Sequence, residues 1–247
     1  MKVKNILFKW VLLVVALTSS TTINAQETKN TGQILSVQQQ SIVGIAALTA
    51  KGDLSKLKPA LHAGLDAGWT VNEIKEAIIH LYAYAGFPRS IRGLQTFMEV
   101  LDERKARGIH DVTGAEASPI NDERSKYERG KAVLDSLLGT PQDGTRTGYS
   151  AFAPTIEIFL KEHLFADIFE RDVLTYQERE LVTISVLSSI GGVEPMLRSH
   201  LNLSLNVGLT PDQLQQFVSV LKQAVGKKEA KAAQQMLDGV LKNNTSN

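Results

Sequence analysis

The sequence contains no cysteine among its 247 residues. A chain without cysteine forms no disulfide, offers no thiolate ligand to a metal and has no cysteine nucleophile. It also lacks an N-terminal cysteine to which a lipid anchor could be attached. Chemistry at any site must therefore come from other side chains. A chain of this length can be stabilised by its hydrophobic core alone.

Aromatic residues are few, and neither sign of charge is in excess. Aromatics make up 6% of the chain, and 27 basic against 26 acidic residues give a formal net charge of +1. We therefore expect no nucleic-acid partner, because proteins that bind nucleic acids use aromatic side chains to stack on bases and basic patches to hold phosphates. The GxGxxG, P-loop, HExxH and GxSxG patterns are also missing from the sequence. We accordingly expect no cofactor and no metal site.

The first 25 residues have the pattern of a targeting segment. Three lysines precede or enter a short apolar run, Trp10 to Leu17, and a small residue, Ala25, ends the segment. This order is typical of a secretory signal peptide, and the apolar run is too short for a comfortable membrane span. We predict a signal peptide at residues 1–25, and a periplasmic or secreted protein that is not held at a membrane after cleavage. The alternative is an uncleaved N-terminal anchor.

Helical periodicity runs through nearly all of the remaining chain. Ser36 is a plausible N-cap, and Thr70 with Glu73 forms a capping-box pattern of the type S/T-x-x-E. No segment shows the alternation of a half-buried strand, so we predict an all-α fold. The proposed division is a first repeat at 26–112, a linker at 113–124 and a second domain at 125–247.

The two halves of the helical region resemble each other. Leu35 to Leu48 aligns with Leu174 to Leu187, and a Gly-x-Thr sequence follows in each half, at Gly68 and at Gly208. Each copy therefore reads as helix, turn, helix, Gly-x-Thr, helix. We predict two helical repeats that pack as a pseudo-dimer.

The two copies differ at the residues able to carry chemistry. In the second copy Glu180 and His200 lie on consecutive helical patterns joined by a short turn, which can bring them within reach of each other. The first copy has small residues at both positions, yet it has His80 on its third helix, where the second copy has a valine. The counterparts are Ser41, Ala60 and Val220. If the copies share a site, one composite site keeps Glu180, His200 and His80 for proton transfer.

Further candidates surround these three residues. Tyr84 follows His80 by one helical turn, and it is either a packing residue or a substrate contact. Arg198 and Arg89, with Arg92 near the latter, are candidates for holding an anionic substrate. We expect Arg179 to be exposed.

Plainer interpretations compete with these assignments. A glutamate in the first turn of a helix commonly stabilises the helix dipole, and a histidine on an apolar helix is commonly a hydrogen-bonded core residue. Neither Glu180 nor His200 is therefore assigned from its position alone. The argument rests on the way the two copies complement each other.

Several stretches are similar to a known family. They are Arg179 to Ile184, Gly191 to Pro195, Arg198 to His200, Gly68 to Pro88, Tyr127 to Gly130 and Phe165 to Phe169. In these stretches the chain resembles the carboxymuconolactone decarboxylase family in its tandem-domain form. The resemblance implies an all-helical fold and a homo-oligomer, a trimer of tandem chains with pseudo-hexameric symmetry.

The resemblance also implies one of two chemistries. Relatives carry out either cofactor-free decarboxylation of a carboxylated muconolactone or alkylhydroperoxidase-like reduction of peroxides through a Cys-x-x-Cys pair just before the position of His200. The stretch from Val193 to Ser199 has no cysteine, which excludes dithiol chemistry. In the decarboxylase-like interpretation His200 or His80 supplies a proton, Glu180 orients the imidazole and Arg198 binds carboxylates.

Two hypotheses remain open at this stage. The first is a cofactor-free lyase or isomerase that acts on a small carboxylated lactone or a related acid. The second is a non-catalytic helical oligomer in the periplasm that binds a small molecule. The second draws on the missing cysteines and on the predicted signal peptide.

Overall fold

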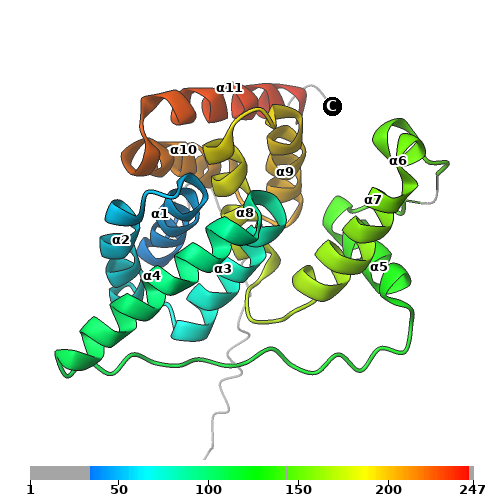
Figure 1. The fold of residues 1–247 in the computed structure, drawn as a ribbon. Helices are drawn as coiled ribbons and strands as arrows, with labels where there is room; N and C mark the ends of the chain where they lie inside the picture. Colours follow the sequence, from blue (N-terminus) through cyan, green and yellow to red (C-terminus); the bar gives the residue numbers. More distant parts are fainter. Residues whose placement is uncertain (1–33, 143, 245–247) are drawn as a thin grey trace, which may run out of the picture. The chain divides into compact units, whose positions relative to one another are not determined.

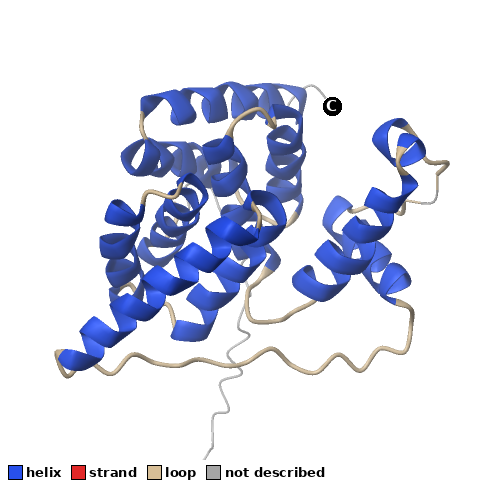
Figure 2. Ribbon diagram, viewed as in Figure 1, coloured by secondary structure: helices blue, strands red, loops and turns tan. Residues whose placement is uncertain are grey.

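Every regular element in residues 34–142 and 144–244, the parts of the chain that the computed structural model describes, is a helix (Figure 2). This confirms the predicted all-α class. No helix in these two ranges is long and apolar enough to span a membrane. The predicted signal peptide, residues 1–25, lies outside the described residues.

In chain order, a run of four helices, a shorter helical segment and a second run of four helices follow one another (Figure 1). The first run is α1 (Val37–Lys51), α2 (Leu54–Asp66), α3 (Val71–Ala85) and α4 (Phe87–Ala106). The middle segment is α5 (Lys126–Leu138), α6 (Gly148–Phe152), α7 (Pro154–Phe159) and the π-helix η1 (Leu160–Phe169). The last run is α8 (Tyr176–Ile190), α9 (Glu194–Asn206), α10 (Pro211–Val225) and α11 (Lys227–Asn244). Helices one to three have 15, 13 and 15 residues in both runs.

Side-chain caps define where many of these helices begin. In a capping box the N-cap hydroxyl accepts from the third helical N–H, while the third side chain accepts from the N-cap N–H. The predicted N-cap Ser36 and the predicted box of Thr70 with Glu73 are both confirmed. The boxes are Ser36–Gln39, Thr70–Glu73, Ser125–Glu128, Thr175–Glu178 and Thr210–Gln213.

Helix α8 lies at the centre of the main core. Its residues from Arg179 to Ser189 are all buried, and it packs against α1, α3 and α9. The contacts between the two runs are reciprocal: α1 touches α8 and α10, and α8 touches α1 and α3. One hydrophobic cluster includes side chains of both runs. This pattern favours the predicted pseudo-dimer of repeats, which remains a prediction, as do the domain boundaries.

The middle segment is a hairpin in which α5 packs along η1 (Figure 1). A second hydrophobic cluster joins the two elements to α9 through Leu203. The approach of the backbones is closest at Gly130, where a Cβ atom would overlap the main-chain carbonyl of Lys161. Glycine is required at this position because no other residue leaves room for η1.

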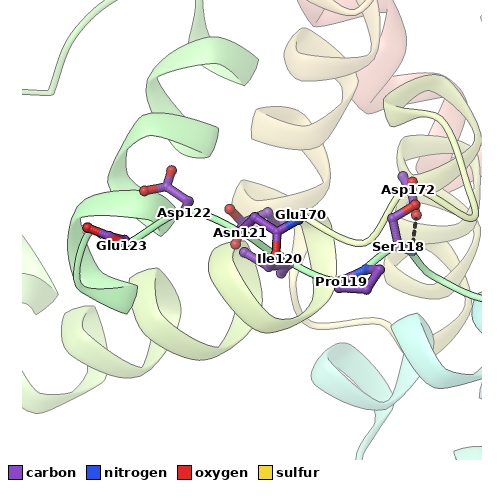
Figure 3. Close-up of a pocket in the computed structure, with 8 residues that line it drawn as sticks. All are labelled: Ser118, Pro119, Ile120, Asn121, Asp122, Glu123, Glu170 and Asp172. Atoms are coloured by element: carbon purple, nitrogen blue, oxygen red, sulfur yellow. Dashed lines mark hydrogen bonds between the residues drawn. The ribbon is translucent and has the colours of Figure 1, made fainter.

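Residues 113–124, the predicted linker, contain no helix and are fastened at two places. At one end Asn72 donates its main-chain N–H to the Thr113 carbonyl at 2.8 Å. Further on, the main-chain N–H of Ser118 donates to Asp172 Oδ1 at 2.9 Å, next to the end of η1 (Figure 3). These bonds hold the connection between the first run and the hairpin against the fold.

The close approach at Gly130 generates a stability prediction. Gly130→Ala is expected to lower the free energy of unfolding by about 2–3 kcal/mol, because the added methyl group forces α5 and η1 apart. Thermal and urea unfolding followed by circular dichroism measure the change. The matched control is Gly239→Ala in α11, where an added Cβ meets nothing within 4 Å. This control should be neutral or stabilising by up to about 1 kcal/mol. A Gly130→Ala protein as stable as the parent would contradict the prediction.

Candidate active site

Glu180 and His200, the predicted acid–base pair, are in direct contact. Glu180 is on the second turn of α8 and fully buried, and His200 is on α9. The distance from Glu180 Oε2 to His200 Nδ1 is 2.9 Å. The short connection between Gly191 and Val193 makes this possible, because it returns α9 along α8. The side chain of His200 keeps 13% of its surface exposed and lines a cavity.

This contact determines the tautomer of His200. A carboxylate only accepts hydrogen bonds, so Nδ1 of His200 carries the hydrogen that points to Glu180. The other ring nitrogen, Nε2, has no hydrogen-bond partner in the described ranges and is available for proton exchange. A carboxylate that fixes one ring nitrogen and leaves the other for chemistry is the arrangement that general acid–base catalysis requires.

His80 is held in a different way, fully buried on α3. Its Nε2 lies 2.8 Å from Thr183 Oγ1, and its Nδ1 lies 3.3 Å from Arg179 Nη1. Thr183 donates its own hydroxyl hydrogen to the Arg179 carbonyl, so it must accept from His80. Arg179 can only donate. His80 is therefore a neutral imidazole with its hydrogen on Nε2. Burial, and next the charge of Arg179, hold the pKa of His80 well below its usual range.

Tyr84 joins the two histidines. Its ring centroid is 5.5 Å from that of His80 and 5.5 Å from that of His200, and the residue lines the cavity. The Tyr84 hydroxyl is buried beside the Thr183 hydroxyl, and Glu180 Oε1 is buried without a hydrogen-bond partner among the described residues. Burial, followed by the negative charge of Glu180, raises the pKa of Tyr84, so its hydroxyl remains a donor.

Arg179, expected to be exposed, is completely buried, so that expectation was wrong. Its Nη2 lies 2.9 Å from Glu76 Oε1. Glu76 also accepts hydrogen bonds from Nε and Nη2 of Arg171, at distances of 2.9–3.0 Å. The carboxylate that compensates the charge comes from α3, a helix of the other run. One member of the charged run at the start of α8, Arg179, therefore belongs to an ion pair in the core.

The predicted anion-binding arginines lie away from the cavity. Arg198 is exposed on α9, where its guanidinium lies 4.0 Å from Met236 Sδ. Arg89 is exposed on α4, and its guanidinium covers Gly52 at the end of α1. Arg92 donates to Gln95 at 3.0 Å. None of the three lines the cavity that contains His200 and Tyr84.

This cavity has a volume of about 1390 Å³ and lies between the hairpin segment and α3, α8 and α9. Its floor holds Tyr84 and His200, and its sides are largely apolar. Four charged side chains line it, and sequence reasoning missed all four as site residues. They are Lys131, Arg146, Glu157 and Lys161. Their only signal in the sequence was a Glu-x-x-x-Lys spacing, which is typical of a solvated helix face.

A smaller surface cavity of about 570 Å³ lies along the linker, between Ser118 to Glu123 on one side and Glu170 and Asp172 on the other (Figure 3). Its lining has no imidazole and no basic side chain. Within residues 34–142 and 144–244, no group of three or more His, Asp and Glu side chains is arranged to hold a metal ion.

Comparisons with known proteins show which family the chain is similar to. Residues 154–238 match the model of the Carboxymuconolactone decarboxylase family. The chain is also 29% identical over 124 residues to the 4-carboxymuconolactone decarboxylase of Acinetobacter baylyi, a match that covers 50% of this chain and 91% of the relative. The range matched by the family model includes Glu180 and His200, whereas His80 and Tyr84 precede it.

The environment of His80 generates a prediction about pH. In the unfolded chain His80 takes up a proton near pH 6.5, whereas the folded protein, with Arg179, His200 and Tyr84 around the ring, keeps it neutral. The unfolded state therefore binds more protons below this pH. Stability should fall by up to about 1.4 kcal/mol for each pH unit below 6.5 through this residue.

His80→Gln, which keeps one donor and one acceptor, should remove this part of the slope. Urea unfolding between pH 5 and pH 7 measures it. His110→Gln, at an exposed position after α4, is the matched control and should keep the parent slope. An unchanged slope in His80→Gln would show that His80 is protonated in the folded state.

Proposed function

Because this chain belongs to the carboxymuconolactone decarboxylase family, we propose that it is a cofactor-free lyase acting on a small carboxylated lactone or a related acid. The observation that carries the proposal is the 2.9 Å contact between buried Glu180 and His200, with Nε2 of the imidazole left for the substrate. The named activity of the Acinetobacter relative makes 4-carboxymuconolactone the first substrate to test.

The reaction has two parts, and proton transfer is the second. Cleavage of the bond between carbon and the carboxylate releases CO2, and its electron pair moves into the conjugated lactone to give an enolate. The enolate carbon then takes a proton from Nε2 of the His200 imidazolium. Solvent later returns a proton to Nε2. Glu180 stabilises the imidazolium and keeps the ring oriented.

Tyr84 has the properties needed to stabilise the enolate. Its hydroxyl is buried, and it stays protonated because its pKa is raised by burial and by the negative charge of Glu180. A buried donor whose ring is held between two neighbouring imidazoles is preorganised to stabilise a developing oxyanion. We therefore assign the enolate oxygen to Tyr84.

His80 takes a supporting role in this mechanism. It is fully buried, it does not line the cavity, and both of its ring nitrogens are occupied, by Thr183 and by Arg179. A neutral imidazole of this kind is a poor proton donor. Its contact with the ring of Tyr84 instead positions that side chain against His200.

The central prediction concerns His200. His200→Ala should lower kcat/KM on 4-carboxymuconolactone by about 100-fold to 10,000-fold, the range associated with a general acid. Loss of substrate absorbance and release of CO2 measure the rate. His110→Ala, which removes an exposed histidine, should leave the rate unchanged. If His200→Ala turned over every accepted substrate at the parent rate, the proposal would fail. If the parent protein bound the lactone without turnover, the non-catalytic alternative would hold.

A second prediction separates Tyr84 from simple packing. Tyr84→Phe keeps the ring contacts with both histidines and removes only the hydroxyl. We expect kcat to fall by about 100-fold or more with little change in KM, because the hydroxyl acts on the enolate and not on the bound substrate. Steady-state kinetics separate the two constants. A rise in KM at constant kcat would instead make Tyr84 a substrate-binding residue.

A further inference from the structure

The charged side chains of the cavity all stand on one of its walls. Lys131 belongs to α5, Arg146 to the connection after it, Glu157 to α7 and Lys161 to η1. The facing wall, from α3, α8 and α9, contributes His200 and otherwise uncharged side chains. The cavity therefore has a charged side and a reactive side. A ligand that spans the cavity is therefore held in a single orientation.

Lys161 is the most deeply buried basic side chain on the charged wall. It is 7% exposed, and its Nζ lies 2.9 Å from Tyr127 Oη and 2.5 Å from Glu157 Oε1. The ammonium also lies 4.6 Å from the centre of the Tyr127 ring, within the range of a cation–π contact. Burial acts to lower the pKa of Lys161, but the bonds with Glu157 and Tyr127 outweigh it, and the pKa is raised. Lys161 is thus charged at neutral pH.

Among the described residues that line this wall, three charged side chains are basic and one is acidic. Glu157 is shared, because it pairs with Lys161 and also with the guanidinium of Arg146. Lys131 is paired with Asp135 at 2.7 Å. Lys161 and Arg146 therefore share a single carboxylate, and among these three groups positive charges outnumber negative ones by one. An ammonium has three N–H donors, and the two bonds of Lys161 to Glu157 and Tyr127 leave one for another acceptor.

The space between the two walls is apolar and large. Volumes of about 300–1,000 Å³ are typical of small-molecule sites, and this cavity exceeds them. A bare carboxylated lactone would leave much of it unfilled. The apolar side chains that line it include Leu134, Leu138, Leu160, Leu164, Met196 and Leu203.

We propose that the Lys161 wall is a carboxylate-binding subsite, and that the substrate is an amphipathic acid whose apolar body of several carbons lies between this wall and His200. The identity of the reacting end rests on the proposed function, whereas the carboxylate subsite does not. The subsite takes the role that sequence reasoning gave to Arg198 and Arg89, both of which lie outside the cavity.

Binding of octanoate tests the subsite without any need for turnover. Calorimetry at low ionic strength should show octanoate bound at least about tenfold more tightly than octanamide, its neutral counterpart. Lys161→Met keeps the apolar stem and removes the charge, so octanoate affinity should fall about tenfold or more while octanamide affinity is unchanged. Lys126→Met, an exposed lysine of the same helical hairpin that does not line the cavity, is the matched control and should bind as the parent does.

Glu157→Gln is the second variant, and it is decisive if Lys161→Met fails to fold as judged by circular dichroism. It removes the carboxylate that competes for Lys161 and Arg146, so octanoate should bind more tightly. Equal affinity of the parent for octanoate and octanamide would overturn the inference, as would unchanged octanoate binding in Lys161→Met or in Glu157→Gln. His200→Ala should retain octanoate binding. Loss of turnover alone therefore bears on the proposed reaction and not on the subsite.

Discussion

A buried arginine is the constraint on which the rest of this structure depends. Arg179 lies in the middle of the fold with none of its surface exposed, and a guanidinium cannot lose its charge to suit its surroundings. Glu76 on α3 compensates it, Arg171 shares that carboxylate, and the remaining Nη1 donor reaches His80. One ion pair thereby fastens the first run of helices to the second. Burial and the charge of Arg179 together keep the neighbouring His80 imidazole neutral. The same ion pair fixes the turn of α8 from which Glu180 projects.

The two histidines beside Tyr84 show how surroundings assign different roles to the same side chain. His80 is enclosed between a guanidinium and a hydroxyl, and both ring nitrogens are occupied. His200 is backed by a carboxylate on one nitrogen and borders the cavity with the other. Burial, and next the positive charge of Arg179, hold the pKa of His80 low and so suppress its imidazolium. Only the second arrangement suits a group that must carry a proton and then release it.

Local patterns in the sequence predicted what local physics controls. Capping boxes and helical periodicity placed the helices, and the short turn after α8 made the contact of Glu180 with His200 predictable. The burial of Arg179 was not predicted, because its partner Glu76 is 103 residues away in the sequence, beyond any local pattern. Arg198 lies on another face of α9 than His200, because two residues along a helix turn the side chain by about 200°. Lys161 was overlooked because its spacing from Glu157 is also that of an ordinary surface pair.

The distance along the chain between Glu76 and Arg179 has a consequence for the order of folding. During synthesis, α3 is complete long before α8 exists. At about 5–20 residues per second the 103 residues between the two partners take roughly 5–20 s to make. Throughout that interval the Glu76 carboxylate lacks its arginine, and the apolar faces that will pack on α8 stay uncovered. The first run is therefore a poor independent folding unit, and nascent chains interrupted between these residues should be frequent clients of chaperones.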